Sequence, residues 1–253
     1  LLFSILASKP ASGEVAAVKK GDLPRGETLL LGRPDQGDRI PAVWLQAPRA
    51  NPAAPATLIV HPEGVAWVLS SSESTNGLVK TILSRGGAVL GIDAFQTGQA
   101  RAPRDRSKGF FTTFNQTDDA ARVQDILTAL EYLRSRTGRQ EVNLLGLEIA
   151  GVWSLFARAL ADDQVNLAAD LAQFRVATDS EYVDKFFIPG IRKAGDFRAA
   201  AVLVKSGKTL LHNASPEFPL AGQDRISAAE MLAWLVPAHP AAARRGSRKA
   251  SPR

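Results

Sequence analysis

The chain has 253 residues, of which 45% are hydrophobic, enough for one large domain with a sizeable core. It contains no cysteine, which excludes disulfide bonds, cysteine-based metal sites and a thiol nucleophile. The formal net charge is +6, but five basic residues lie in the last ten positions; we therefore interpret the charge as a solvated tail and expect no nucleic-acid partner.

The sequence begins at Leu1, and residues 1–27 are expected to be a linker or the remnant of a preceding segment. The apolar start fits a signal-type remnant or an ordinary helix or linker. No run approaches the ~20 apolar residues of a membrane span, so we expect no membrane partner. His61, His212 and His239 are widely separated, so we expect neither a metal site nor a cofactor.

Short apolar runs of strand type recur along the chain, at residues 28–31, 40–45, 57–60, 88–92, 142–145 and 209–212. The first two are expected to pair as an antiparallel hairpin, with Pro41 favouring an edge position. The runs at 57–60 and 88–92 are continuously apolar, as in strands buried on both faces.

Helical spacing of apolar residues predicts helices at residues 73–85, 118–136, 150–161, 165–188 (one or two) and 227–235. Residues 197–204 fit either a helix or a strand. The alternation of strands and helices predicts an α/β domain over residues 28–236, with a mostly parallel, doubly wound sheet and helices on both faces. Residues 94–117 form a long Arg-rich loop, and residues 237–253 a basic, disordered tail.

The most informative stretch is residues 142–160, where a strand turns sharply into an Ala- and Leu-rich helix. Gly146, Ala150 and Gly151 are the small residues that a tight turn needs, because the strand and helix backbones approach closely there. This is the outline of a nucleophile elbow, usually spelled G-x-S-x-G. Here Glu148 occupies the tip in place of serine.

Together with this turn, four stretches resemble the α/β-hydrolase superfamily, and within it bacterial proteins of the acetyl-xylan-esterase and dienelactone-hydrolase type. They are residues 39–45, residues 60–64 (V-H-P-E-G), residues 92–98 and residues 114–126. The likeness covers roughly residues 28–215. It implies an esterase-type module for a carbohydrate ester, secreted or periplasmic, and a degenerate second module beside a preceding catalytic hydrolase module.

The sequence departs from the pattern of that family in two ways. The serine is replaced at Glu148, and the histidine expected after a last strand is represented only by His239 in the tail. The C-terminal part of the domain is therefore expected to be truncated. The stretch at 61–64 resembles an oxyanion loop, with Glu63 or Gly64 and Ile149 as backbone donors. Pro62 has no N–H to offer.

Several side chains are candidates for a site at the carboxyl ends of the strands. Glu148 and His212 could form a carboxylate–base pair, while each could equally be a structural residue. His61, Asp93, Arg101 and Arg104 are expected to line the site, although Asp93 could instead cap the loop that follows it. Arg101, Arg104, Arg106 and Lys108 could bind an acidic ligand or could simply be a solvated loop.

Three hypotheses follow from these residues. The first is a catalytically degenerate, esterase-type module with a structural, carbohydrate-contacting or partner-contacting role. The second is an active ester hydrolase with an unusual site at Glu148 and His212. The third is a binding module for an acidic ligand that uses the Arg-rich loop at residues 101–108.

Overall fold

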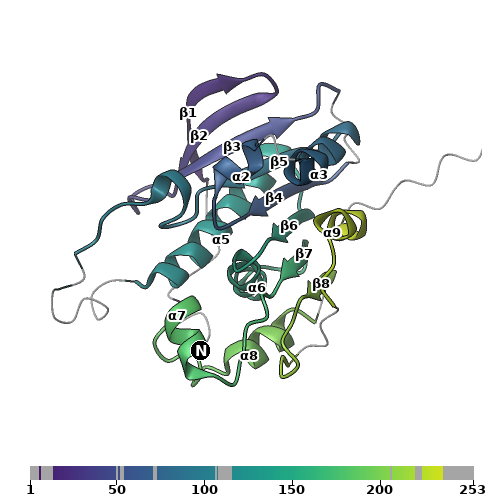
Figure 1. Ribbon diagram of the computed structural model, residues 1–253. Helices are drawn as coiled ribbons and strands as arrows, with labels where there is room; N and C mark the ends of the chain where they lie inside the picture. Colours follow the sequence, from purple (N-terminus) through teal and green to yellow (C-terminus); the bar gives the residue numbers. More distant parts are fainter. Residues whose placement is uncertain are drawn as a thin grey trace, which may run out of the picture.

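The computed structural model describes residues 6, 14–49, 51, 54–70, 73–105, 107, 116–205, 207–219 and 224–235. They form one eight-stranded sheet with the strand order β1-β2-β3-β5-β4-β6-β7-β8 (Figure 1). Its strands are β1 Ala16–Leu23, β2 Gly26–Gly32, β3 Ile40–Gln46, β4 Ala56–Val60, β5 Ala88–Ile92, β6 Val142–Gly146, β7 Val165–Asp170 and β8 Thr209–His212.

The sheet is antiparallel at one end and parallel through the rest. β1, β2, β3 and β5 pair antiparallel in turn, and β5, β4, β6, β7 and β8 pair parallel. The helices are α2 Val65–Leu69, α3 Glu73–Ser84, α5 Asp118–Thr137, α6 Ala150–Leu160, α7 Asp179–Lys185, α8 Asp196–Leu203 and α9 Ala228–Leu235. The predicted mostly parallel, doubly wound α/β fold is confirmed.

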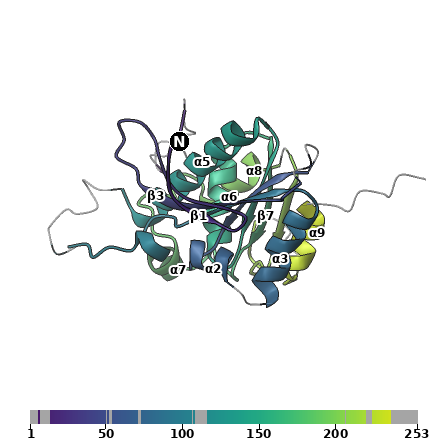
Figure 2. The same cartoon turned by 90° about the horizontal axis from the view of Figure 1, so that it is seen from above.

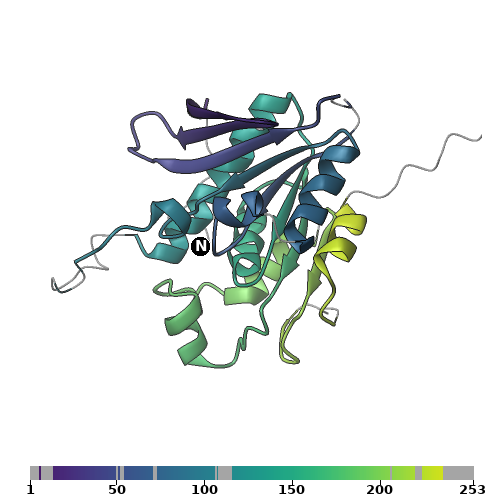
Figure 3. The ribbon, with the colours of Figure 1, turned by 45° about the horizontal axis from the view of Figure 1, so that its top comes forward.

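Two apolar clusters lie on the two faces of the sheet. One packs α5, α6 and α8 against one face, and the other packs α2, α3 and α9 against the opposite face (Figure 2). Figure 3 shows α3 (blue) and α9 (yellow-green) side by side on their face. Strands with helices on both sides are buried throughout and mostly apolar, as β4, β5 and β6 are.

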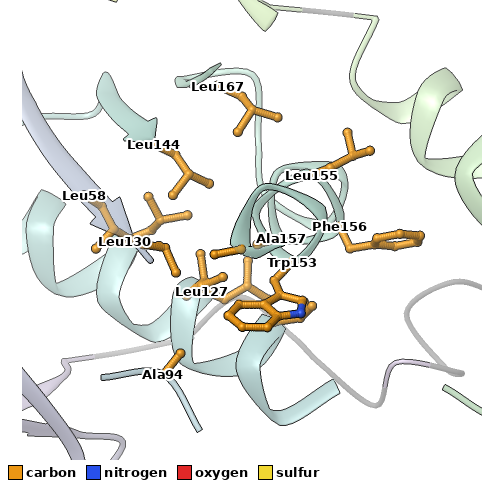
Figure 4. Packing of buried hydrophobic residues seen from close by; sticks show 14 of the residues in the cluster. Leu58, Ala94, Leu127, Leu130, Leu144, Trp153, Leu155, Phe156, Ala157 and Leu167 are labelled. Carbon is orange, nitrogen blue, oxygen red and sulfur yellow. The ribbon is translucent and has the colours of Figure 1, made fainter. Parts of the chain in front are cut away.

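The larger cluster is centred on α5 and α6. Leu127 and Leu130 of α5 meet Leu58 of β4 and Leu144 of β6, and all four are buried (Figure 4). α5 begins where Thr117 accepts a hydrogen bond from the N–H of Ala120, as a capping residue does. This packing fixes where β6 ends and where α6 begins.

Three predictions about the elements are wrong. The linker or remnant expected over residues 1–27 contains strand β1, which is mostly exposed and held by pairing with β2. Pro41 lies in β3, an interior strand, where it falls just before the pairing of β3 with β5 begins at Ala42. Residues 165–188 start with a strand, β7, and only α7 is helical there.

Two further elements complete the comparison with the sequence. Residues 197–204, which fitted either state, form helix α8, and helix α2 follows β4 unpredicted. Among the described residues, α9 is the one helix or strand after β8. The expected truncation after that strand stays a prediction, and the predicted tail at 237–253, with His239, lies outside the described residues. Within the part described, no helix is long and apolar enough to cross a bilayer.

Candidate active site

Glu148 lies in the turn between β6 and α6, at the carboxyl end of the parallel strands. Its φ is 51°, in the left-handed region, which costs energy for any residue with a Cβ. The N–H of Gly151 donates to the Glu148 carbonyl at 2.9 Å, and that of Leu147 to the Val60 carbonyl of β4 at 3.0 Å. The predicted strand–turn–helix is therefore present, and the turn is tied to the neighbouring strand.

The two glycines of this turn are needed for close approach. A Cβ on Gly146 would lie 2.7 Å from Cα of Gly151, and a Cβ on Gly151 would collide with the backbone of Asp170. No side chain fits at either position without moving the backbone. The small residues in the sequence thus have the steric role that was predicted for them.

His61 follows β4 and is almost completely buried, with 5% of its surface exposed. Its Nδ1 accepts a hydrogen bond from the N–H of Glu63 at 3.0 Å. Burial lowers the pKa of His61 to about 4, against the opposing effect of the Glu63 charge. The imidazole is therefore neutral near pH 7, with its proton on Nε2 because Nδ1 is an acceptor.

Nε2 of His61 lies 3.6 Å from Oε1 of Glu148, longer than a direct hydrogen bond. The side chain of Glu148 is 62% exposed, so the carboxylate faces solvent. The other neighbour of His61 is Trp67 of α2, whose ring stacks on the imidazole with centroids 4.8 Å apart. The site thus combines an exposed carboxylate, a neutral imidazole N–H and a half-buried indole.

Asp93 caps the loops around the site. Its Oδ1 accepts from the N–H of Val65 at 2.7 Å and its Oδ2 from the N–H of Gln99 at 3.0 Å. It is 1% exposed, and burial raises its pKa while both hydrogen bonds oppose the rise. A Cβ on Gly64 or on Gly98 would collide with this carboxylate. Asp93 therefore positions two loops, as its capping alternative proposed.

The expected oxyanion donors are mostly used within their own loop. The N–H of Glu63 donates to His61 Nδ1 and the N–H of Gly64 to the His61 carbonyl at 2.9 Å. Both N–H groups therefore already have an acceptor, and their role as oxyanion donors stays a prediction. Ile149, at the start of α6, has no acceptor for its N–H among the described residues. One backbone donor remains where an oxyanion hole needs two.

His212 ends β8 and is buried, with 1% exposed. Its Nδ1 accepts from the N–H of Ile226 at 3.2 Å, and its Nε2 has no partner among the described residues. Burial lowers its pKa, with Asp170 opposing. β7 lies between β6 and β8, and the contact recorded for Glu148 in the described part is with His61. A catalytic role for Glu148 with His212 stays a prediction.

The Arg-rich loop is only partly described. Arg104 pairs with Asp118 at the start of α5 and lies over the ring of Phe95. Arg101 is exposed, while Arg106 and Lys108 lie outside the described residues. Because Arg104 already has an acidic partner, a site for an acidic ligand there would have to compete with it.

Two residues near the site were not singled out from the sequence. Trp67 lies in α2, a helix too short for a periodic signal, although a tryptophan three residues after Gly64 was a visible clue. Asp170 ends β7, where its Oδ1 accepts from the N–H of Ala172 and from Asn213. It was missed because a helix was expected there. No group of three or more potential metal ligands occurs in the part of the chain described.

Comparison with known proteins gives likeness in structure and not in sequence. No family model and no curated protein matches the chain. A proposed acetyl xylan esterase from Bacteroides fragilis superposes with a TM-score of 0.63 at 10% identity, over 92% of this chain and 68% of that one. A glucuronoyl esterase from Solibacter usitatus gives 0.58 at 15% identity, over 83% and 73%.

Proposed function

Since this chain has the α/β-hydrolase fold, we propose that it is an esterase-type module that no longer hydrolyses esters and instead contacts a carbohydrate or a protein partner. The proposed partner is a catalytic hydrolase module of the same protein. The observation that carries this proposal is the exposed Glu148 carboxylate, which lies 3.6 Å from Nε2 of a neutral His61 whose Nδ1 is already an acceptor.

Ester hydrolysis on this fold needs a nucleophile, a base beside it and two donors for the oxyanion. Glu148 stands where a serine would, and the nearest imidazole presents an N–H toward it, not a lone pair. A histidine with its proton on that nitrogen cannot accept a proton from a nucleophile there. The N–H groups of Glu63 and Gly64 donate inside their own loop, which also argues against hydrolysis by a serine-type mechanism.

The same arrangement suits contact with a polar ligand. A solvent-facing carboxylate accepts hydrogen bonds from hydroxyl groups, and the imidazole N–H donates one. Trp67 of helix α2 adds a half-buried aromatic surface beside His61. The structural likeness to two carbohydrate-directed esterases supports this choice of ligand.

The test is turnover of p-nitrophenyl acetate by the isolated chain, beside the variants Glu148→Gln and Glu148→Ser. We expect all three to match the uncatalysed rate, because residual rates are all that remain when triad members are missing. We also expect Glu148→Ser not to react with an organophosphonate, measured as a mass shift on the intact protein. Stoichiometric labelling would show that a competent base is already present and would overturn the proposal.

The contact between His61 and Glu148 favours one competing function. A carboxylate can itself be the nucleophile, forming an ester intermediate that water then cleaves. In that case the chain would hydrolyse esters, and turnover would be lost in Glu148→Gln. If the parent hydrolyses esters, turnover that is kept in His61→Asn but lost in His212→Asn would assign the base to His212.

A further inference from the structure

A groove on the face of the sheet that carries α2 and α3 has no part in the proposed function. It consists of two adjoining cavities of about 550 and 390 Å³ that share Arg25, Lys80 and Leu83. Cavities of this size are typical of sites for small organic ligands. The groove lies between the turn that joins β1 to β2, the end of β3, and the helices α2 and α3.

The floor of this groove is apolar. Leu45 comes from β3, Val68 from α2, and Val79 and Leu83 from α3, and all four are buried. Leu69 adds an apolar side chain at the rim, where it is 45% exposed. An apolar surface of this kind, open to solvent, favours a ligand with a hydrocarbon chain or ring.

The rim of the groove is basic. Arg25, Arg49 and Lys80 line it, and no acidic side chain lines it among the residues that the structure describes. All three side chains are exposed, and none forms an ion pair within the described residues. This contrasts with Arg33, Arg134 and Arg192, each paired with an aspartate. The unpaired cations surround one apolar floor, so the groove complements a ligand that is apolar in its body and negative at one end.

We infer that this groove binds an amphipathic organic anion, such as a carboxylate on an alkyl chain. The apolar body would lie on Leu45, Val68 and Leu83, and the carboxylate would reach Lys80 and the arginines at the rim. The residues of the groove are not those of the Glu148 site. α2 nevertheless connects them, because Val68 lines the groove while Trp67 of the same helix stacks on His61.

The experiment titrates the whole chain with dodecanoate below its micelle concentration, using calorimetry and backbone amide NMR shifts. We expect saturable binding, with shifts confined to residues 23–25, 45–49 and helices α2 and α3. Dodecyltrimethylammonium, with the same chain and the opposite charge, is expected not to bind. Equal binding of both ligands, or no saturable binding of dodecanoate, would overturn the inference.

Two charge-matched double variants locate the site. Arg49→Glu with Lys80→Glu is expected to weaken dodecanoate binding by ~10-fold or more, since two attractive charges become repulsive. Lys193→Glu with Lys205→Glu makes the same charge change at exposed positions away from the groove and is expected to bind as the parent does. Equal weakening in both would mean a non-specific effect of net charge. Leu69→Ser is expected to weaken binding without changing charge.

Discussion

Two histidines lie at the carboxyl ends of strands β4 and β8, which β6 and β7 separate, and they differ in what lies beside their Nε2 atoms. His61 and His212 are both buried, and each Nδ1 accepts a backbone N–H from the loop that follows. Nε2 of His61 faces the exposed carboxylate of Glu148, whereas Nε2 of His212 has no partner among the described residues. The same Nδ1 hydrogen bond therefore accompanies two different surroundings of Nε2.

Each histidine also has an aspartate at the end of the adjacent strand. Asp93, at the end of β5, joins two separate loops through the N–H groups of Val65 and Gln99. Asp170, at the end of β7, bonds to Ala172 and Asn213 close by. The loops beside His61 are therefore held together by the buried Asp93 carboxylate. The region around His212 depends instead on the pairing of its strands.

The largest effect is expected for Asp93→Ala. It leaves two buried N–H groups without an acceptor, each worth ~1–3 kcal/mol, so the free energy of unfolding should fall by ~3–4 kcal/mol in urea titration. Asp184→Ala, at an exposed position in α7, is the control and should change it by less than ~0.5 kcal/mol. If Asp170→Ala lowers the free energy of unfolding by more than Asp93→Ala does, the proposed difference between the two aspartates is wrong.

The next effect is the pH dependence that His61 gives to stability. The pKa of His61 in the folded state is about 4, below the ordinary 6.5. Between these values the unfolded chain binds a proton that the folded chain does not, so the contribution of neutral His61 to the free energy of unfolding is full above pH 6.5 and is lost as the pH falls toward 4. We expect the stability difference between the parent and His61→Asn to shrink over this range, by at most ~3 kcal/mol. Asparagine keeps an acceptor for Glu63, so the difference isolates the titration.

Other buried groups titrate in the same range, which is why the variant must be compared with the parent. Burial raises the pKa of Asp125 to about 7, and that contribution is common to both proteins. NMR titration of the imidazole gives a direct check. A titration of His61 near pH 6.5 would contradict the expected burial effect.

A smaller loss is expected for His212→Leu, which removes the acceptor of the Ile226 N–H. The free energy of unfolding should fall by ~1–2 kcal/mol, and amide exchange should quicken in α9, which follows Ile226. His212→Asn keeps an acceptor at the position of Nδ1 and omits the unpartnered nitrogen, so it should recover most of the loss. Faster exchange in α6 instead of α9 would show that His212 supports the Glu148 turn after all.

The smallest expected effect is a gain. Glu148 holds a left-handed conformation that glycine adopts without strain, so Glu148→Gly should raise the free energy of unfolding by ~0.5–1 kcal/mol. Such a gain would mean that Glu148 is kept for contact with a ligand and not for stability. A loss would mean that its contact with His61 outweighs the strain.

The sequence predicts those parts of the molecule whose signals are local. The buried strands β4, β5 and β6 are short apolar runs, and the turn at Glu148 is visible in its small residues. β7 was mistaken for a helix because its Ala168 and Ala169 suit a helix, and only pairing with β6 and β8 makes it a strand. β1 has no apolar alternation and depends on β2.

The sequence names several residues of the candidate site but does not indicate which of them lie together. His61 and Glu148 meet because β4 and β6 are adjacent in the sheet, a non-local fact that no spacing in the sequence encodes. The use of the Glu63 N–H by His61 depends on the shape of one loop. The direction of this hydrogen bond decides whether Nε2 of His61 can act as a base or as a donor, and the sequence alone does not reveal it.

The enclosure of Asp93 has a consequence for how this sequence can change over time. Gly64 and Gly98 lie close to its carboxylate from two loops, and neither position can carry a Cβ while the aspartate is present. A shorter residue at position 93 would open space beside both glycines but would leave the N–H groups of Val65 and Gln99 without their acceptor. The three positions are therefore expected to be inherited as one unit, so that substitutions at them occur together across descendants of this chain.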